Sequence, residues 1–264
     1  MARAGAAVAH LHDVVREAAV PGVTTAELDA IAERELRNRG AAPSFKGYRV
    51  GRDVPAFPAT LCTSVNEQVV HGIPSANVVL RAGDVLKVDA GAYVDGYHAD
   101  AAVTWVVGGQ SSPAVERLVN DTRAALWDGI RTVRDGSRLS DIGAAIADRG
   151  HHAGYGVITE YAGHGVGRSL HEDPPVANTG PAGRGPVLRP GIALAIEPMF
   201  TLGSENTTLD GDGWTIATSD GSTAAHWEHT VAVTDDGPWV LTARSDEPAW
   251  PDQHPQMFGL NYAR

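Results

Sequence analysis

Two aspartates, Asp89 and Asp100, stand on either side of a tight turn in the stretch KVDAGAYVDGYHAD. If the Asp-Gly pair at 95–96 is a two-residue hairpin turn, the register places Asp100 opposite Gly91. Asp89 then lies opposite Ala102, and the two aspartates are diagonal neighbours on one face, with Cβ atoms roughly 7–8 Å apart. Two facing carboxylates repel each other unless a cation lies between them. The hairpin therefore predicts a positively charged ligand at this position.

Further segments place ionisable side chains within or beside apolar stretches. GHGVGRSLHEDPP contains His164 and His171, GIALAIEPMF contains Glu197, and AAHWEHTVAVT contains Glu228. A carboxylate at the end of an apolar strand is costly unless it is paired or bound to metal. Each group alone is more often a solvated strand end or an ordinary ion pair. Together with the hairpin they supply four carboxylates and one imidazole, which is typical of Mn, Fe, Co or Zn in a two-ion hydrolytic site.

Helical patterns alternate with the strand-like stretches that would position these groups. In VTTAELDAIAERELRNRG, Thr24 and Glu27 form a capping box, apolar residues recur at helical spacing, and Gly40 ends the helix. A similar passage recurs at residues 136–150, and each passage follows another helical segment and precedes strand-like stretches. The repetition indicates an internal duplication into two α+β halves. A chance likeness between alanine-rich helices is the alternative.

The duplication predicts one domain over residues 1–264. Its halves are expected at roughly 1–110 and 111–245, followed by a proline-rich, irregular tail at 246–264 that lies over the surface.

Composition narrows the class of protein. The chain has 264 residues, 43% of them hydrophobic, which is enough for a substantial core. A formal net charge of −11 disfavours nucleic acid or an anionic membrane as the main partner. The single cysteine, Cys62, excludes an internal disulfide, and neither a membrane span nor a signal-peptide core is recognisable. We expect a cytoplasmic protein.

Six motifs occur in an order that resembles a known family, the methionine aminopeptidases, specifically the short bacterial type I form. They are NEQVVHGIP, DAGAYVDGYHAD, GHGVGRSLHEDP, AIEPM, DGWTIAT and WEHT. The resemblance extends from about residue 3 to about residue 245. It implies the α+β pita-bread fold, with two pseudo-symmetric α/β halves around a curved antiparallel sheet. It also implies removal of the N-terminal methionine from nascent proteins and peptides whose second residue is small.

The resemblance assigns the metal ligands residue by residue. Asp89 would chelate one ion, His164 and Glu197 would bind the other, and Asp100 and Glu228 would bridge the two. The ions would be Co, Mn, Fe or Zn.

Beyond these ligands, the resemblance implies a monovalent cation near Asn66, held largely by backbone carbonyls. It also implies a monomer that acts on peptides or on nascent chains at the ribosome.

Three residues receive catalytic roles from the same resemblance. Glu197 would be the general base, and His71 and His171 would orient the scissile amide and stabilise the oxyanion that forms on its carbonyl. For His71, the alternative is a structural histidine beside the Gly-Ile-Pro turn.

The resemblance places an apolar pocket around the first side chain of the substrate. It is lined by Tyr48, Phe57, Cys62, Leu170 and Trp214, with His71 at its edge. Contacts with aromatic rings and sulfur suit the unbranched thioether of methionine. The alternative is that these residues are ordinary core.

Several positions depart from the commonest family pattern. Phe57 stands where a tyrosine is frequent, Leu170 where an aromatic residue is frequent, Val70 where a cysteine often precedes the histidine, and His226 where a glutamine is common. YRVGRDVPAF contains extra residues, so the placement of Tyr48 is less well defined. These departures concern the shape of the pocket and none is a metal ligand.

Three other functions are compatible with parts of the sequence. An Xaa-Pro peptidase of the same superfamily uses similar ligands, but DGWTIAT combined with WEHT favours methionine removal. A non-catalytic binding protein on this scaffold would typically lose ligands, and all five are present. A glycosidase with two carboxylates leaves His164, Glu197 and Glu228 unexplained.

Overall fold

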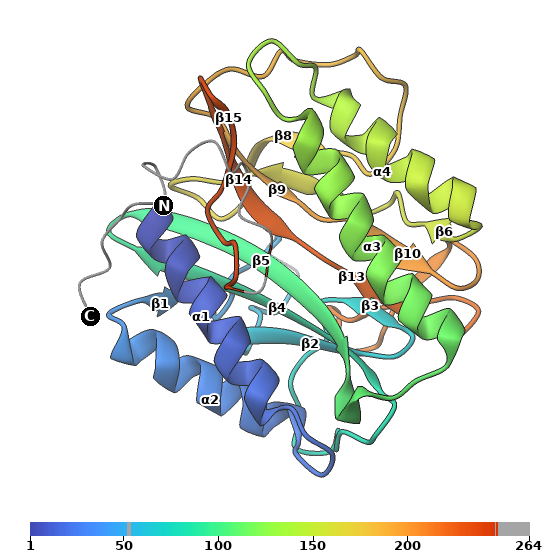
Figure 1. Cartoon of the computed structure of the whole chain (residues 1–264). Helices are drawn as coiled ribbons and strands as arrows, with labels where there is room; N and C mark the ends of the chain where they lie inside the picture. The colour runs from blue at the N-terminus through green and yellow to red at the C-terminus, as the bar shows by residue number, and fades with distance from the viewer. Residues whose placement is uncertain (52–53, 246, 248–264) are drawn as a thin grey trace.

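Two pairs of helices flank the strands (Figure 1) in the computed structural model, which describes residues 1–51, 54–245 and 247. The helices are α1 (Ala2–Ala18), α2 (Thr25–Asn38), α3 (Pro113–Thr132) and α4 (Ser140–Ala153), with a short 3-10 turn, η1 (Val107–Gly109), before α3. All but Glu247 of the predicted tail, residues 246–264, lies outside the described residues.

The predicted capping box of α2 is confirmed. The Thr24 side chain accepts a hydrogen bond from the backbone N–H of Glu27, and the Glu27 carboxylate accepts one from the backbone N–H of Thr24. These two bonds satisfy N–H groups that a helix start otherwise leaves without partners. Gly40 follows the helix with a φ of +66°, a conformation that favours glycine.

The predicted hairpin is formed by β4 (Val85–Val94) and β5 (Tyr97–Val106). The register pairs Asp100 with Gly91 and Asp89 with Ala102, as the two-residue turn predicts. The turn residues Asp95 and Gly96 have φ of +50° and +86°, which is the backbone of a type I′ turn. The two aspartates therefore share one face of the hairpin.

The strands of the described residues form four antiparallel sheets. The first joins β4 and β5 to β1 (Ala42–Pro43) and β2 (Leu61–Val65). The second has the order β13 (Ala224–His226), β10 (Met199–Thr201), β6 (Gly156–Val157). The third has the order β11 (Thr207–Leu209), β12 (Ile216–Thr218), β3 (Gln68–Val70). The fourth has the order β15 (Gly237–Val240), β14 (His229–Thr234), β9 (Ala193–Ile196), β7 (Gly163–Gly165), β8 (Glu172–Val176).

The predicted halves repeat the order of two helices followed by strands, and they are joined through strands. Ala102 of β5 and Glu228, just before β14, exchange two backbone hydrogen bonds of 3.3 and 2.9 Å. Beside them, the Thr230 hydroxyl bonds to both the N–H and the carbonyl of Asp100. β3 also pairs with β12 across the predicted boundary. Asp100 and Glu228 therefore lie at the seam where the two predicted halves meet.

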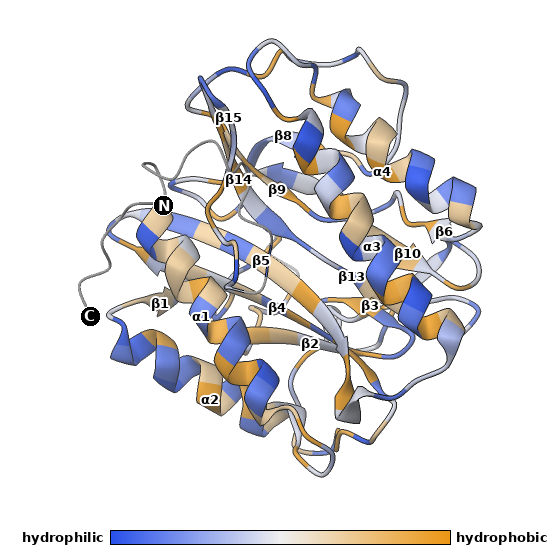
Figure 2. Cartoon of the chain, in the orientation of Figure 1, coloured by the Kyte–Doolittle hydropathy of each residue, from blue (hydrophilic) through white to orange (hydrophobic). Residues whose placement is uncertain are grey.

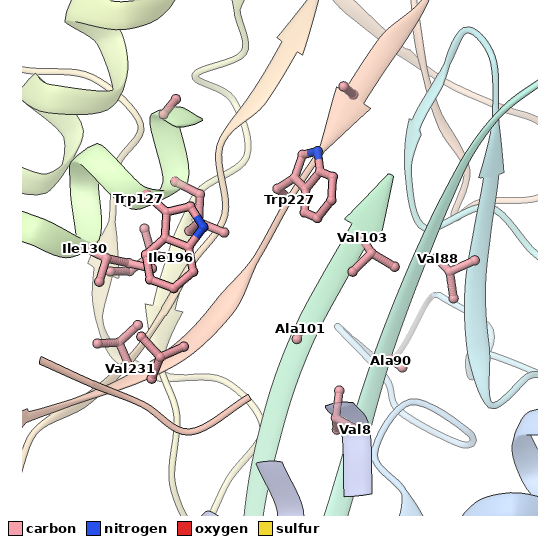
Figure 3. Packing of buried hydrophobic residues seen from close by; sticks show 14 of the residues in the cluster. Val8, Val88, Ala90, Ala101, Val103, Trp127, Ile130, Ile196, Trp227 and Val231 are labelled. Atoms are coloured by element: carbon pink, nitrogen blue, oxygen red, sulfur yellow. The ribbon is translucent and has the colours of Figure 1, made fainter. Parts of the chain in front are cut away.

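Alternation along the strands separates the core from the site. On the hairpin, Val88, Ala90, Ala101 and Val103 belong to the main hydrophobic cluster, which Val8 of α1 joins (Figure 3). The intervening residues, including Asp89 and Asp100, point to the opposite face because successive strand residues alternate. Figure 2 shows polar and apolar residues interleaved along the helices, and α2 buries Leu28, Ala32 and Leu36.

In the second half, the cluster is built by Trp127 and Ile130 of α3 with Ile196 and Val231 of the strands (Figure 3). Trp227 lies between this group and the hairpin, next to the seam at Glu228. Among the described residues, no helix combines the length and apolar content that crossing a membrane would require.

Candidate metal centre

One cavity is lined by every residue that the sequence predicted for the site. These are Tyr48, Phe57, Cys62, His71, Asp89, Asp100, His164, Leu170, His171, Glu197, Trp214 and Glu228. Phe45 and Val50 also line it, and sequence reasoning missed both because neither carries a motif or a chemical signature.

The five predicted ligands come from five different places in the fold. Asp89 and Asp100 lie on β4 and β5, and His164 lies on β7. Glu197 lies between β9 and β10, and Glu228 between β13 and β14. Only the two aspartates are close in sequence, so the strand pairing described above is what brings the set together.

The ligand atoms are close to one another. Asp100, His164 and Glu228 each offer one atom, and these atoms lie within 4.8 Å of one another. His164 Nε2 is 3.9 Å from Asp100 Oδ2 and 3.8 Å from Glu197 Oε1. Asp89 lines the same cavity as these four residues. The geometry therefore unites all five groups.

The imidazole of His164 is oriented by its own backbone neighbour. Its Nδ1 lies 2.8 Å from the carbonyl oxygen of Gly165. Donation from Nδ1–H to that carbonyl leaves Nε2 as the lone-pair atom on the carboxylate side, the arrangement common among metal-binding histidines.

Burial makes the four carboxyls costly to ionise without a cation. It raises the pKa of Asp89 to about 7. It also raises the pKa values of Asp100, Glu197 and Glu228 well above their usual range, and for these three groups repulsion from neighbouring carboxylates adds to the shift. Three buried oxygens, Asp89 Oδ1, Asp100 Oδ1 and Glu228 Oε1, have no hydrogen-bond partner among the described residues. A mostly oxygen donor set with one imidazole fits divalent cations.

The predicted catalytic histidines lie on the wall of the same cavity. The ring of His171 is 4.2 Å from that of His164 and 4.9 Å from that of Tyr48, between centroids. His71 has a φ of +59° and packs edge-on against Trp214, with centroids 6.3 Å apart. Burial lowers the pKa of His71 to about 4 and that of His171 to about 3. Both imidazoles are therefore neutral at pH 7 and can donate a hydrogen bond.

The predicted pocket residues form a separate apolar cluster with Phe45 and Ala59. The rings of Phe57 and Trp214 meet edge to face at 5.2 Å, and Trp214 Nε1 donates to the carbonyl of Pro55 at 2.9 Å. Burial, followed by the nearby carboxylates, raises the pKa of the Cys62 thiol well above its usual value, so it is a neutral apolar group. The cluster thus supplies an apolar wall beside the carboxylates.

His226, noted in the sequence only as a departure from the family pattern, lies close to the ligand set. Its Nε2 is 3.8 Å from Glu197 Oε2, and the side chain is buried. Burial lowers its pKa to about 3.

Lys87 lies beside Asn66, near which the family resemblance implies a monovalent cation. The carbonyl oxygen of Asn66 lies 2.7 Å from Nζ of Lys87. Burial lowers the pKa of Lys87 to about 7, and Glu67 and Asp84 oppose that shift.

Residues 1–235 match the model of Metallopeptidase family M24. The chain belongs to metallopeptidase family M24, and the predicted enzyme class is confirmed.

Within that family the chain is similar to methionine aminopeptidases. It is 49% identical to methionine aminopeptidase 1 of Mycobacterium tuberculosis over 92% of this chain and 91% of that protein. The solved structure of methionine aminopeptidase from Thermotoga maritima superposes with a TM-score of 0.88 at 41% identity, over 92% of this chain and 95% of that one. The α+β fold and the family resemblance predicted from the motifs are thereby confirmed.

A second kind of structure shares the fold alone. An Xaa-Pro dipeptidase from Bacillus anthracis superposes with a TM-score of 0.71 at 24% identity, over 94% of this chain and 59% of that chain.

Proposed function

We propose that this chain removes the N-terminal methionine from peptides and nascent proteins in a metal-dependent hydrolysis. One observation carries the proposal: a single cavity joins five potential metal ligands, four of them buried, to an apolar cluster. The similarity to methionine aminopeptidases over most of the chain supports the same reading.

The ligand roles form part of the proposal. Asp89 would hold one divalent ion, His164 and Glu197 the other, and Asp100 and Glu228 would contact both. Mn, Co, Fe and Zn suit these donors. Such ions act as Lewis acids and lower the pKa of bound water towards neutrality.

The side chains around the ligands supply the remaining chemistry. A carboxylate oxygen of Glu197 accepts a proton from the attacking water and returns it to the leaving amine. The neutral rings of His71 and His171 donate hydrogen bonds to the peptide, where they orient the scissile amide and stabilise negative charge on its carbonyl oxygen. Both rings lie on the cavity wall, within reach of a peptide held there.

The apolar cluster decides which first residue enters. Phe57, Cys62 and Trp214 present rings and a neutral thiol, and an unbranched thioether gains favourable contacts with both. A charged first side chain would lose its hydration without gaining a partner. The family resemblance places the GHGVGR segment, residues 163–168, and His71 tightly around the second residue, so we expect a small second residue to be preferred.

The Xaa-Pro peptidase and binding-protein alternatives are less well supported. Identity to the Xaa-Pro dipeptidase is 24%, against 49% to a methionine aminopeptidase, and all five ligands are present. A cytoplasmic location, a monomeric state and action at the ribosome stay predictions from the sequence.

The direct test is hydrolysis of a methionine-initiated tripeptide by the purified chain after chelation and re-addition of single metals. Chelation should abolish turnover, and Mn, Co, Fe or Zn should restore it. Undiminished turnover in the chelated protein, with metal analysis showing none bound, would contradict the proposal.

A further inference from the structure

A buried lysine lies next to the metal centre and on the same face of the hairpin. Lys87 precedes Asp89 by two positions on β4, so both side chains point to the site side of the sheet. Lys87 is 1% exposed and is among the largest fully buried side chains of the described residues. Burial of an ammonium group costs free energy unless polar groups of the protein replace its hydration. The groups that contact Lys87 Nζ therefore indicate its role.

The partners of Lys87 are backbone carbonyls from three separate segments. Nζ lies 2.7 Å from the oxygen of Asn66, 3.2 Å from that of Ala224 and 3.4 Å from that of Val85. Asn66 belongs to the turn between β2 and β3, Val85 begins β4, and Ala224 begins β13. Three converging carbonyl oxygens are the environment that also suits a small monovalent cation.

Several hydrogen bonds of its backbone and side chain fix the position of Asn66. Asn66 has a φ of +55°. Its amide side chain accepts a hydrogen bond from the N–H of Val85 and donates one to Asp84, and its own N–H donates to the carbonyl of Val85. The N–H of Ala224 donates to the Asn66 carbonyl at 3.1 Å. Hydrogen bonds within the protein therefore position the Asn66 carbonyl for the contact with Lys87.

These segments lead directly to the reacting groups. Four residues after Ala224 the chain reaches Glu228, and five residues after Asn66 it reaches His71. We infer that the ammonium of Lys87 is a built-in substitute for a bound monovalent cation, and that it is a positioning residue tying the segments of Glu228 and His71 to the strand of Asp89.

The Lys87 ammonium takes the place of the monovalent ion expected near Asn66. A covalently attached ammonium at the carbonyl cluster occupies the position that a diffusible cation would take and repels that cation. The stability and turnover of the wild type should therefore not depend on sodium or potassium. Removal of the Lys87 side chain should make both properties depend on these ions. The stability of the chain in different salts tests this role of Lys87 without peptide hydrolysis.

The experiment measures melting temperature of the metal-free and metal-loaded protein in potassium, sodium and N-methylglucamine chloride at equal ionic strength. The variants are Lys87→Ser, which opens space for an ion, and Lys87→Met, which fills the space with an apolar group. Lys46→Ser is the matched control, because Lys46 is the chain's other lysine and lies exposed beside Glu33.

The wild type and Lys46→Ser should melt alike in all three salts. Lys87→Ser should lose about 5–10 °C in N-methylglucamine, as expected for loss of charged buried hydrogen bonds in a chain of this size, and should regain several degrees in potassium or sodium. Lys87→Met should also melt at a lower temperature than the wild type, and neither potassium nor sodium should raise that temperature. Turnover of Lys87→Ser on a methionine tripeptide should follow the same salt dependence, through kcat more than KM.

Two results would overturn the inference. One is a wild type whose melting temperature or turnover falls when alkali ions are replaced, which would show a diffusible ion in use. The other is a folded Lys87→Ser that responds equally to all three salts. The wild-type comparison decides the question if Lys87→Ser does not fold.

Discussion

His164 and His171 lie side by side, with ring centroids 4.2 Å apart, yet they have different proposed roles. His164 Nε2 faces Asp100 and Glu197, whereas His171 packs against Tyr48 on the cavity wall. His171→Ala should keep its metal content and lose roughly 10²–10³-fold in kcat, the usual loss for one oxyanion donor. His164→Ala should lose metal as well as activity. Metal quantification on both variants separates the roles, and the reverse pattern would show that ligand and catalyst have been exchanged.

For single residues, the sequence indicated which side chains belong to the site better than it indicated which residues surround them in the fold. Asp89 and Asp100 could be paired from spacing alone, because one short turn fixes their register. His164, Glu197 and Glu228 could be assigned only through the family resemblance, since no local pattern relates strands so far apart in the chain. Phe45, His226 and the partners of Lys87 depend on tertiary packing, which leaves no local signal.

The β4–β5 hairpin is the element on which the site depends most. Gly96 adopts a φ of +86°, and a Cβ there would meet no atom within 4 Å. A substitution would therefore destabilise the protein through backbone strain and not through a steric clash with neighbouring residues. Gly96→Val should lower the free energy of unfolding by about 1–2 kcal/mol, because a β-branched residue is strained in the left-handed region. Gly211→Val is the control, since Gly211 also has open space but no positive φ. Equal losses in denaturant titrations would show that the turn does not set the hairpin's stability.

Helices and turns could be predicted from the sequence where the local signals were strong. The capping box at Thr24 and Glu27 and the Asp-Gly turn at 95–96 both have short-range chemistry that the fold does not override. The pairing of β3 with β12 and the division of the strands into four sheets could not be predicted, because short strands of two to five residues acquire their partners from packing.

For the molecule as a whole, the metal-free site should make stability depend on pH. The folded-state pKa of Asp89 is raised to about 7 from an ordinary value of 3.8. Between these values the folded chain keeps a proton that the unfolded chain has lost, so its stability falls as pH rises from about 4 to about 7. Divalent metal displaces the proton, so the gain in melting temperature on adding Mn or Co should be larger at pH 8 than at pH 5.

Calorimetry or dye-based melting of metal-free and loaded protein at both pH values checks this expectation. Asp100→Ala and Glu228→Ala should reduce the gain, because each removes a proposed ligand. A metal-free protein that melts at the same temperature as the loaded one at pH 8 would contradict the account.

The most direct measurement is kcat/KM on five peptides: Met-Ala-Ser, Leu-Ala-Ser, Lys-Ala-Ser, Met-Phe-Ser and Ala-Pro-Ser. Met-Ala-Ser should be preferred by about tenfold or more, because an unbranched apolar side chain fits the Phe57, Cys62 and Trp214 wall. The branched Leu should be slower through overpacking, Lys should fail through desolvation, and Met-Phe-Ser should be slowed by its large second residue. Faster cleavage of Ala-Pro-Ser than of Met-Ala-Ser would contradict the proposed function and favour the Xaa-Pro alternative.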